Sequence, residues 1–156
     1  MKNYLKLIIS IIACQMAGIL GAVFTTNSVD TWYSTIIRPD LAPPNWIFGP
    51  VWTTLFLLMG ISLFLVWKKG IQSRESKIAV SVFVVQLILN TLWSVIFFGL
   101  HNPGLAFAEI ILLWTSILIS IILFYRISKI AAYLLIPYIL WVSFAAFLNY
   151  SIWILN

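Results

Sequence analysis

The chain has 156 residues, of which 63% are hydrophobic and only 8% are charged, and its mean hydropathy is +1.08. A soluble domain has roughly 45–50% apolar and about 25% charged residues, so one core could not hide this much apolar surface. The composition therefore predicts a protein embedded in a lipid bilayer. A net charge of +5 would suggest nucleic acid as the partner of a soluble protein. Here the basic residues fall in the gaps between apolar runs, so they indicate membrane topology and no nucleic-acid partner.

Residues suited to metal binding or nucleophilic catalysis are scarce. The single cysteine, Cys14, lies in an apolar run and has no partner for a disulfide bond. The single histidine, His101, lies in a short loop, so a pair of helical histidines cannot hold a haem. The chain also lacks a CxxC pair, a phosphate-binding glycine loop and a Ser–His–Asp set. We expect no metal site and no hydrolytic active site.

Apolar runs divide the chain into transmembrane segments, each of which needs roughly 20 residues. Five such runs cover approximately Leu5–Thr26, Trp46–Trp67, Ile78–Leu100, Gly104–Tyr125 and Ala131–Leu155. The first run exceeds the ~7–15 apolar residues of a signal peptide and is interpreted as a retained helix. The fold class that we expect is an all-α integral membrane protein, a bundle of five transmembrane helices forming one domain over residues 1–156.

The connection between the first two runs, residues 27–45, is the only long one. It contains Trp32, Tyr33, Arg38 and Asp40 together with three prolines. A long aromatic loop over a compact bundle is more often functional than incidental. The alternative is an aromatic belt at the depth of the lipid headgroups, where Trp and Tyr settle in any case.

The second and third runs carry aromatic and amide side chains at helical spacing. One face holds Trp52, Phe56, Met59 and Leu63 in the second run, and Gln86, Asn90, Trp93 and Phe97 in the third. Amides are costly against lipid, so these faces should point into the bundle. Pro50, near the start of the second run, predicts a late start of its regular helix.

The fourth run contains Glu109, the only acidic residue inside a run, about one turn from its beginning. We expect this carboxyl group to reach the membrane surface. A proton-coupled exporter would place such a group nearer the midplane. Export of hydrophobic cations through Glu109 is kept as the alternative function.

The fifth run repeats the aromatic pattern, with Tyr138, Trp141, Ala145 and Leu148 on one face and Asn149 beside them. Pro137 removes a backbone donor and predicts a kink. If these faces converge, they form a flat apolar cavity with a few hydrogen-bond donors, which suits a planar aromatic ligand. The alternative is that Asn90 and Asn149 only cross-link helices.

Basic residues are segregated by side. If five helices alternate in direction, one side holds eight of the nine Lys and Arg residues and the other holds Arg38 alone. The eight are Lys2, Lys6, Lys68, Lys69, Arg74, Lys77, Arg126 and Lys129. The positive-inside rule then predicts a multi-pass protein of the cell membrane, with the amino terminus cytoplasmic and the carboxyl terminus outside.

Three motifs in order resemble the TspO/MBR family, the tryptophan-rich sensory proteins that include the mitochondrial translocator protein, or peripheral-type benzodiazepine receptor. The first is RPDLAPPNWIFGPVW at residues 38–52. The second is NTLWS at residues 90–94, followed by Phe97 and Phe98, and the third is LIPY at residues 135–138, continuing through Trp141, Ala145 and Asn149. The resemblance extends over essentially the whole chain.

The resemblance implies a five-helix bundle, usually a homodimer, whose pocket lies among the first, second and fifth helices. Family members bind porphyrins such as protoporphyrin IX or haem, and isoquinoline or benzodiazepine drugs, with no obligatory cofactor. Transport, sensing and light-dependent porphyrin breakdown have been proposed for them. By motif match, the ligand-binding residues are Trp32, Tyr33, Trp52, Asn90, Tyr138, Trp141 and Ala145. Trp52 and Trp141 match the pair linked to porphyrin photodegradation, the one catalytic activity that the sequence supports. Porphyrin propionates would accept hydrogen bonds from an indole N–H, Asn90 or Arg38.

Two departures from the family pattern bear on partners. Leu148 and Tyr150 begin the motif of cholesterol-binding members, but no Lys or Arg follows. Small residues at Ala13, Ala17 and Gly21 have a spacing associated with dimer contacts, whereas the third run has no clear GxxxG. The sequence therefore does not locate a dimer face.

Overall fold

The computed structural model describes residues 1–156 and consists of helices joined by short connections and one long loop. The helices are α1 (Asn3–Val29), α2 (Phe48–Lys69), α3 (Arg74–Ser94), α4 (Pro103–Ile127), α5 (Lys129–Leu134) and α6 (Ile136–Leu155). A 3₁₀ turn, η1 (Asn45–Ile47), precedes α2, and a π-helical turn, η2 (Val95–Gly99), extends α3. Five helical segments are long and apolar enough to cross a membrane, counting α5 with α6 as one. The predicted five-helix membrane protein is confirmed.

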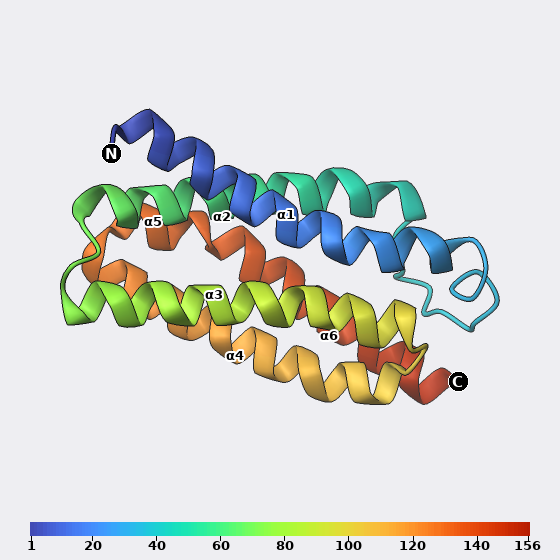
Figure 1. Ribbon diagram of the computed structural model, residues 1–156. Helices are drawn as coiled ribbons and strands as arrows, with labels where there is room; N and C mark the ends of the chain where they lie inside the picture. Colours follow the sequence, from blue (N-terminus) through green and yellow to red (C-terminus); the bar gives the residue numbers. More distant parts are fainter.

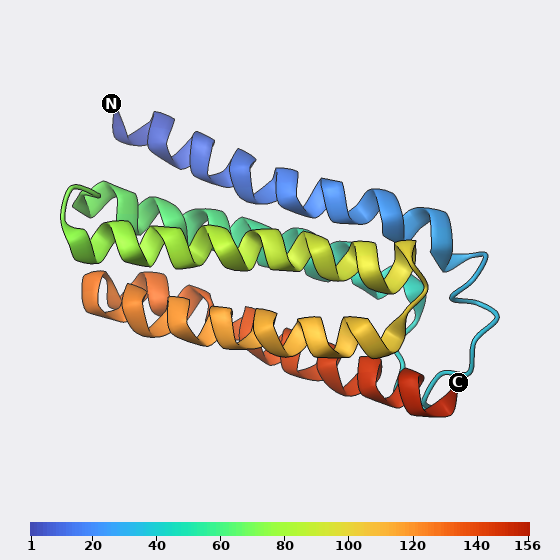
Figure 2. The ribbon, with the colours of Figure 1, turned by 60° about the horizontal axis from the view of Figure 1, so that its bottom comes forward.

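The helices run side by side along one axis and leave two distinct ends (Figure 1). The amino terminus and the turns between α2 and α3 and between α4 and α5 lie at one end, which we call the amino-terminal end. The loop of residues 30–44, the turn between α3 and α4 and the last residue of α6 lie at the other, which we call the loop end. Viewed from another side, α1 forms one edge of the bundle (Figure 2). Helix α1 packs against both α2 and α3, and α4 packs against α3 and α6.

Helix α1 meets α2 through glycine. A Cβ on Gly60 would lie 2.7 Å from the Ile11 Cα, so only glycine permits this approach of two backbones. A Cβ on Gly18 would likewise lie 2.7 Å from the Phe56 ring of α2. The two helices therefore approach closely around the middle of their lengths.

The small residues of α1 also pack inside the protomer. The Thr91 hydroxyl of α3 donates a hydrogen bond of 2.9 Å to the Ala17 carbonyl oxygen, and a Cβ on Gly21 would lie 3.1 Å from the Ser94 Oγ. Ala17 and Gly21 thus face α3, and their spacing is explained without a dimer contact.

Both prolines act as the sequence predicts. Regular α-helix starts at Phe48, after the 3₁₀ turn and just before Pro50. Before Pro137 the fifth segment is interrupted at Leu135, between α5 and α6. The Ser62 hydroxyl holds α5 by donating 2.7 Å to the Ala131 carbonyl oxygen. The π-helical turn was not predicted, because nothing in the composition of residues 95–99 distinguishes it from α-helix.

Packing differs between the two halves of the bundle. A cluster of 17 buried apolar residues fills the bundle from the amino-terminal end to its middle, and Val66, Phe83 and Phe124 are among its members. Under the loop lies a smaller cluster of 6, which includes Tyr33, Phe97 and Phe98. Between these clusters the helices leave space.

Candidate ligand-binding cavity

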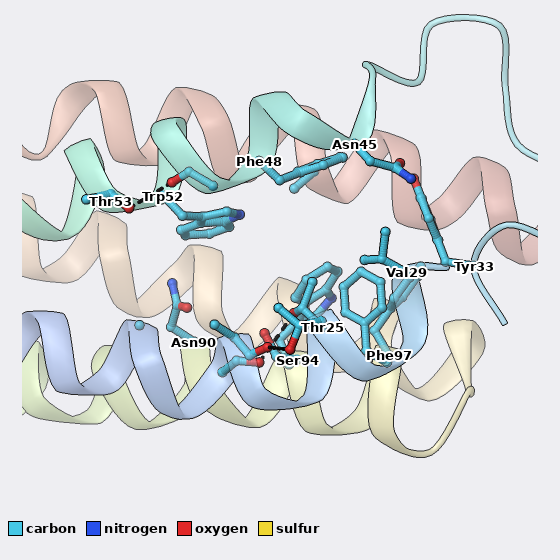
Figure 3. A pocket seen from close by; sticks show the side chains of 18 of the residues that line it. Thr25, Val29, Tyr33, Asn45, Phe48, Trp52, Thr53, Asn90, Ser94 and Phe97 are labelled. Atoms are coloured by element: carbon cyan, nitrogen blue, oxygen red, sulfur yellow. Dashed lines mark hydrogen bonds between the residues drawn. The ribbon is translucent and has the colours of Figure 1, made fainter. Parts of the chain in front are cut away.

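A cavity of about 520 Å³ occupies the loop-end half of the bundle. Its walls come from α1, from η1 with the start of α2, from the end of α3 with η2, and from α6. Trp52 and Phe48 extend into it from α2, while Asn90, Ser94 and Thr25 face them from α3 and α1 (Figure 3). Protein sites for small ligands measure roughly 300–1,000 Å³, so the cavity has the size of a binding site.

Tryptophans from two helices line the cavity together. Trp52 packs beside Phe56, with ring centroids 5.7 Å apart, and Trp141 meets Phe48 edge to face at 6.1 Å. The Trp141 Nε1 is buried and has no hydrogen-bond partner. A buried indole N–H normally has a partner, so this wall retains an unused donor.

Asn90 is held by a hydrogen-bonded chain beneath the cavity. Its Nδ2 donates 2.7 Å to the Tyr138 hydroxyl, which in turn donates 2.6 Å to the Gln86 Oε1. Tyr138 is completely buried and does not line the cavity. This chain fixes the Asn90 side chain and leaves its Oδ1 without a protein partner.

A second amide, Asn149, joins three helices. The Trp93 Nε1 donates 2.9 Å to its Oδ1, and its Nδ2 donates 2.8 Å to the Pro103 carbonyl oxygen at the start of α4. Both Asn90 and Asn149 line the cavity. The sequence left two roles open for these amides, lining a cavity or only cross-linking helices. In the structure each amide does both.

The loop closes the outer end of the cavity through Tyr33, which is only 3% exposed. The Arg38 guanidinium lies 4.9 Å from the Tyr33 ring centroid and donates 3.4 Å to the Asn45 Oδ1. Burial raises the pKa of Tyr33, and the Arg38 charge opposes that shift. Tyr33 and Asn45 lie together at this end (Figure 3).

Two further contacts hold the loop to the bundle. The Trp32 ring stacks on the His101 ring at 4.5 Å, with 8° between their planes. The Asn156 side chain accepts 3.0 Å from the Ile37 N–H and donates 2.8 Å to the Ile37 carbonyl oxygen. Both loop aromatics thus have defined contacts, which a belt of free interfacial residues would lack.

The residues expected at the site do not all reach the cavity. It is lined by Tyr33, Trp52, Asn90, Trp141 and Ala145, whereas Trp32 and Tyr138 lie outside its lining. The family resemblance implied a wall from the first helix without naming its residues, and the structure places Gln15, Thr25 and, just past the end of α1, Asp30 in the lining. Gln15 and Thr25 are uncharged polar positions inside the first apolar run, a weak signal by which to recognise a wall.

Two expectations about charged side chains are corrected. Glu109 was expected to reach the surface, but it is 6% exposed, and neither carboxyl oxygen has a hydrogen-bond partner. It lies in the second turn of α4, a helix that packs against α3 and α6. Arg38 was one of three donors expected for a porphyrin propionate, beside an indole N–H and Asn90, and it does not line the cavity.

The fold and the cavity define a class: a multi-pass α-helical membrane protein with an internal, tryptophan-walled cavity under an ordered loop. Residues 10–154 match the TspO/MBR family, so the chain belongs to that family. It is 44% identical over 154 residues to the tryptophan-rich protein TspO of Archaeoglobus fulgidus, covering 99% of each chain. It is 36% identical to protein CrtK of Rhodobacter capsulatus, covering 93% of this chain and 89% of that one. It is 34% identical to the translocator protein of Homo sapiens, covering 91% and 85%.

Proposed function

We propose that this protein binds a tetrapyrrole, a porphyrin or haem, in the cavity and acts as its sensor, carrier or light-dependent degrader. The observation that carries the proposal is the pairing of Trp52 and Trp141 on the walls of one cavity of about 520 Å³. Indole faces stack on a flat macrocycle, and the unused Trp141 N–H offers a donor to a polar edge.

The same cavity accommodates isoquinoline- and benzodiazepine-like drugs in this proposal. These ligands are also flat and largely apolar, and the lining provides only a few polar groups to orient them, among them Asn90 and Thr25. Two relatives are called tryptophan-rich sensory protein and translocator protein, and both names fit a ligand-responsive role.

We further propose that the protein is a homodimer in the cell membrane, with the amino-terminal end of the bundle cytoplasmic. Support for this orientation comes from the fold, which brings the eight basic residues of the amino terminus and of the α2–α3 and α4–α5 turns to one end and leaves Arg38 at the other. The dimer rests on the family resemblance, because the small residues of α1 are used within the protomer.

Titration of the purified protein with protoporphyrin IX in the dark, followed by tryptophan quenching, tests the binding proposal. We expect saturable binding that Trp52→Phe and Trp141→Phe weaken by a few-fold to tenfold, because each loses stacking area and an N–H donor. Trp67→Phe is the matched control, since Trp67 lies at the other end of α2 and does not line the cavity. Equal affinity in all four proteins would contradict the proposal.

One observation supports a second candidate function, proton-coupled export of hydrophobic cations. Glu109 is a buried carboxyl group without a partner inside a membrane span, and such groups commonly belong to proton relays. Glu109 does not line the cavity. Export through this residue therefore needs a movement that brings the carboxyl group into contact with the ligand path.

A further inference from the structure

The cavity is open on one side. Of its 27 lining residues, eight are also exposed on the outer surface of the protomer. Four belong to α1 or directly follow it, and four belong to η1 or the start of α2: Ile19, Ala22, Thr26 and Asp30, and Asn45, Trp46, Gly49 and Thr53. The lining residues of α3, η2 and α6 are all buried or half-buried. Side chains that face both the cavity and the exterior mark an opening, which we call the α1–α2 seam.

The two helices are in contact at mid-bundle and lie apart nearer the loop end. A Cβ on Gly18 of α1 would lie 2.7 Å from the Phe56 ring of α2. The Gln15 Nε2 donates a hydrogen bond of 3.2 Å to the Thr53 carbonyl oxygen. About one turn further toward the loop, a Cβ on Gly49 would meet no atom within 4 Å. The cavity therefore reaches the outside between these helices, on the loop side of the contact between Gln15 and Thr53.

The α1–α2 seam opens within the bilayer, and its edge is suited to hydrocarbon. Both helices lie in segments long and apolar enough to cross a membrane, so lipid chains lie against their exposed sides. The two hydroxyl groups on the edge are bonded within their own helices. Thr26 donates 2.9 Å to the Ala22 carbonyl oxygen, and Thr53 donates 2.8 Å to that of Gly49. The one charge and the one amide of the opening lie at its loop end.

We infer that the cavity binds tetrapyrroles that carry a long hydrocarbon chain on one edge, with the ring between Trp52 and Trp141 and the chain passing through the α1–α2 seam into the lipid. This inference rests on the proposed function, because it names a substituent of the ligand of that same cavity. A volume of about 520 Å³ is the size of the ring system alone, so a long chain has to lie outside. Exposing its methylene groups to water is unfavourable, whereas the seam leads them into the acyl region of the bilayer.

Two esters of protoporphyrin IX with the same ring and the same charge test the inference. They are the monomethyl ester and the monohexadecyl ester, each of which keeps one free propionate. Each ester is titrated in the dark into the protein in nanodiscs of one zwitterionic lipid, and tryptophan quenching is the readout. Protein-free nanodiscs measure the partition of each ester into lipid, and the affinities are corrected for it.

Three variants locate the chain. Ala22→Phe and Gly49→Phe place a ring on either side of the α1–α2 seam, and Val23→Phe is the matched control. Val23 is exposed on α1 beside Ala22 and does not line the cavity. The quantity compared between proteins is the selectivity, which is the ratio of the affinities for the two esters.

We expect wild type to bind the hexadecyl ester within about threefold of the methyl ester. In Ala22→Phe and Gly49→Phe, the hexadecyl ester should lose about tenfold more affinity than the methyl ester, because the added ring fills the path of the chain. Val23→Phe should leave both affinities within about twofold of wild type. Binding of the methyl ester to each variant also shows that the variant is folded.

Three results overturn the inference and leave the proposed function standing. The first is wild type that binds the methyl ester and rejects the hexadecyl ester, which would mean that the seam is closed or is covered by a second protomer. The second is an unchanged selectivity in Ala22→Phe and Gly49→Phe, which would place the chain elsewhere. The third is an equal loss of selectivity in Val23→Phe. If neither ester binds wild type, the proposed function itself fails, and the inference fails with it.

Discussion

The Tyr138 hydroxyl lies 2.7 Å from the Asn90 Nδ2 and 2.6 Å from the Gln86 Oε1, so one buried tyrosine joins α6 to two turns of α3. Tyr138 is 0% exposed, which leaves no water to replace either bond. The side chain that faces the cavity, Asn90, is thus oriented by a residue that does not line it.

Replacing Tyr138 by Phe should therefore destabilise the protein and weaken ligand binding together. Two buried polar groups lose their partner, which costs about 1–3 kcal/mol. Thermal unfolding in detergent measures the loss, and a porphyrin titration should show a several-fold lower affinity. Tyr150→Phe is the control, because Tyr150 is 44% exposed and its hydroxyl makes no hydrogen bond. An equal melting temperature for the two variants would show that the buried network contributes nothing.

The tryptophan pair should matter more for photochemistry than for affinity. Trp52→Phe or Trp141→Phe should cost about 1 kcal/mol of binding, since most of each ring remains. Light-dependent bleaching should fall much further, because an indole is oxidised near an excited porphyrin whereas a phenyl ring resists oxidation. The porphyrin spectrum is followed under illumination for wild type, both single variants and the double variant, at saturating protein. Equal bleaching rates in all four would make these tryptophans packing residues.

Cysteine labelling determines the orientation of the protein in the membrane. The buried Cys14 is first replaced by Ser, and single cysteines are then placed at Arg74 and at Asp40, both of which are exposed. An impermeant thiol reagent should label the Arg74 position only from the cytoplasmic side and the Asp40 position only from outside. The opposite pattern would reverse the proposed topology.

Glu109→Gln separates the two candidate functions. Glutamine keeps the shape of the side chain and removes the titrating proton. If the protein is a tetrapyrrole binder, Glu109→Gln should change the porphyrin affinity by no more than a few-fold relative to wild type. It should also leave any pH-dependent flux unchanged. Drug flux into vesicles across a pH gradient is the second measurement, with Glu75→Gln, an exposed residue of α3, as the control. Loss of pH-dependent flux in Glu109→Gln alone would favour the exporter.

The contact between α1 and α2 predicts a contrast between two glycines. Gly60→Ala places a methyl group 2.7 Å from the Ile11 Cα and should cost about 1–3 kcal/mol, because two backbones must separate. Gly49→Ala meets no atom within 4 Å and lies in the first turn of α2, so it should be neutral or stabilise by up to about 1 kcal/mol. Thermal unfolding of both variants in detergent measures this difference in stability. Equal stabilities would mean that the helices adjust freely at Gly60.

The sequence predicted the five spans because each is a long apolar run, and it predicted the interruption near Pro137 because proline lacks the required N–H. The sequence also predicted that Trp52, Asn90 and Trp141 share one cavity, because polar and aromatic groups in a span face inward, and all three line it. It misplaced Glu109, because distance from a helix end says nothing about which neighbours cover a side chain. In this bundle α4 packs against α3 and α6, and Glu109 is buried.

Other features could not be predicted from local patterns at all. The contribution of α1 depends on where glycines let it approach α2 and α3, and that is a property of pairs of helices. The contact between Ile37 and Asn156 joins positions 119 residues apart through one side chain. The π-helical turn at 95–99 depends on packing beneath the loop, where Tyr33 contacts Phe97 and Phe98.

The position of the cavity restricts how this protein can handle a ligand. Its lining extends from the loop end to mid-bundle, while Val66, Phe83 and Phe124 are buried in the core of the other half. A ligand bound there, as we propose, would therefore exchange at the loop end of the bundle. Sensing and photochemical breakdown need nothing more than that single access. Carriage across the bilayer needs a second state, in which the packed half separates and the loop side closes.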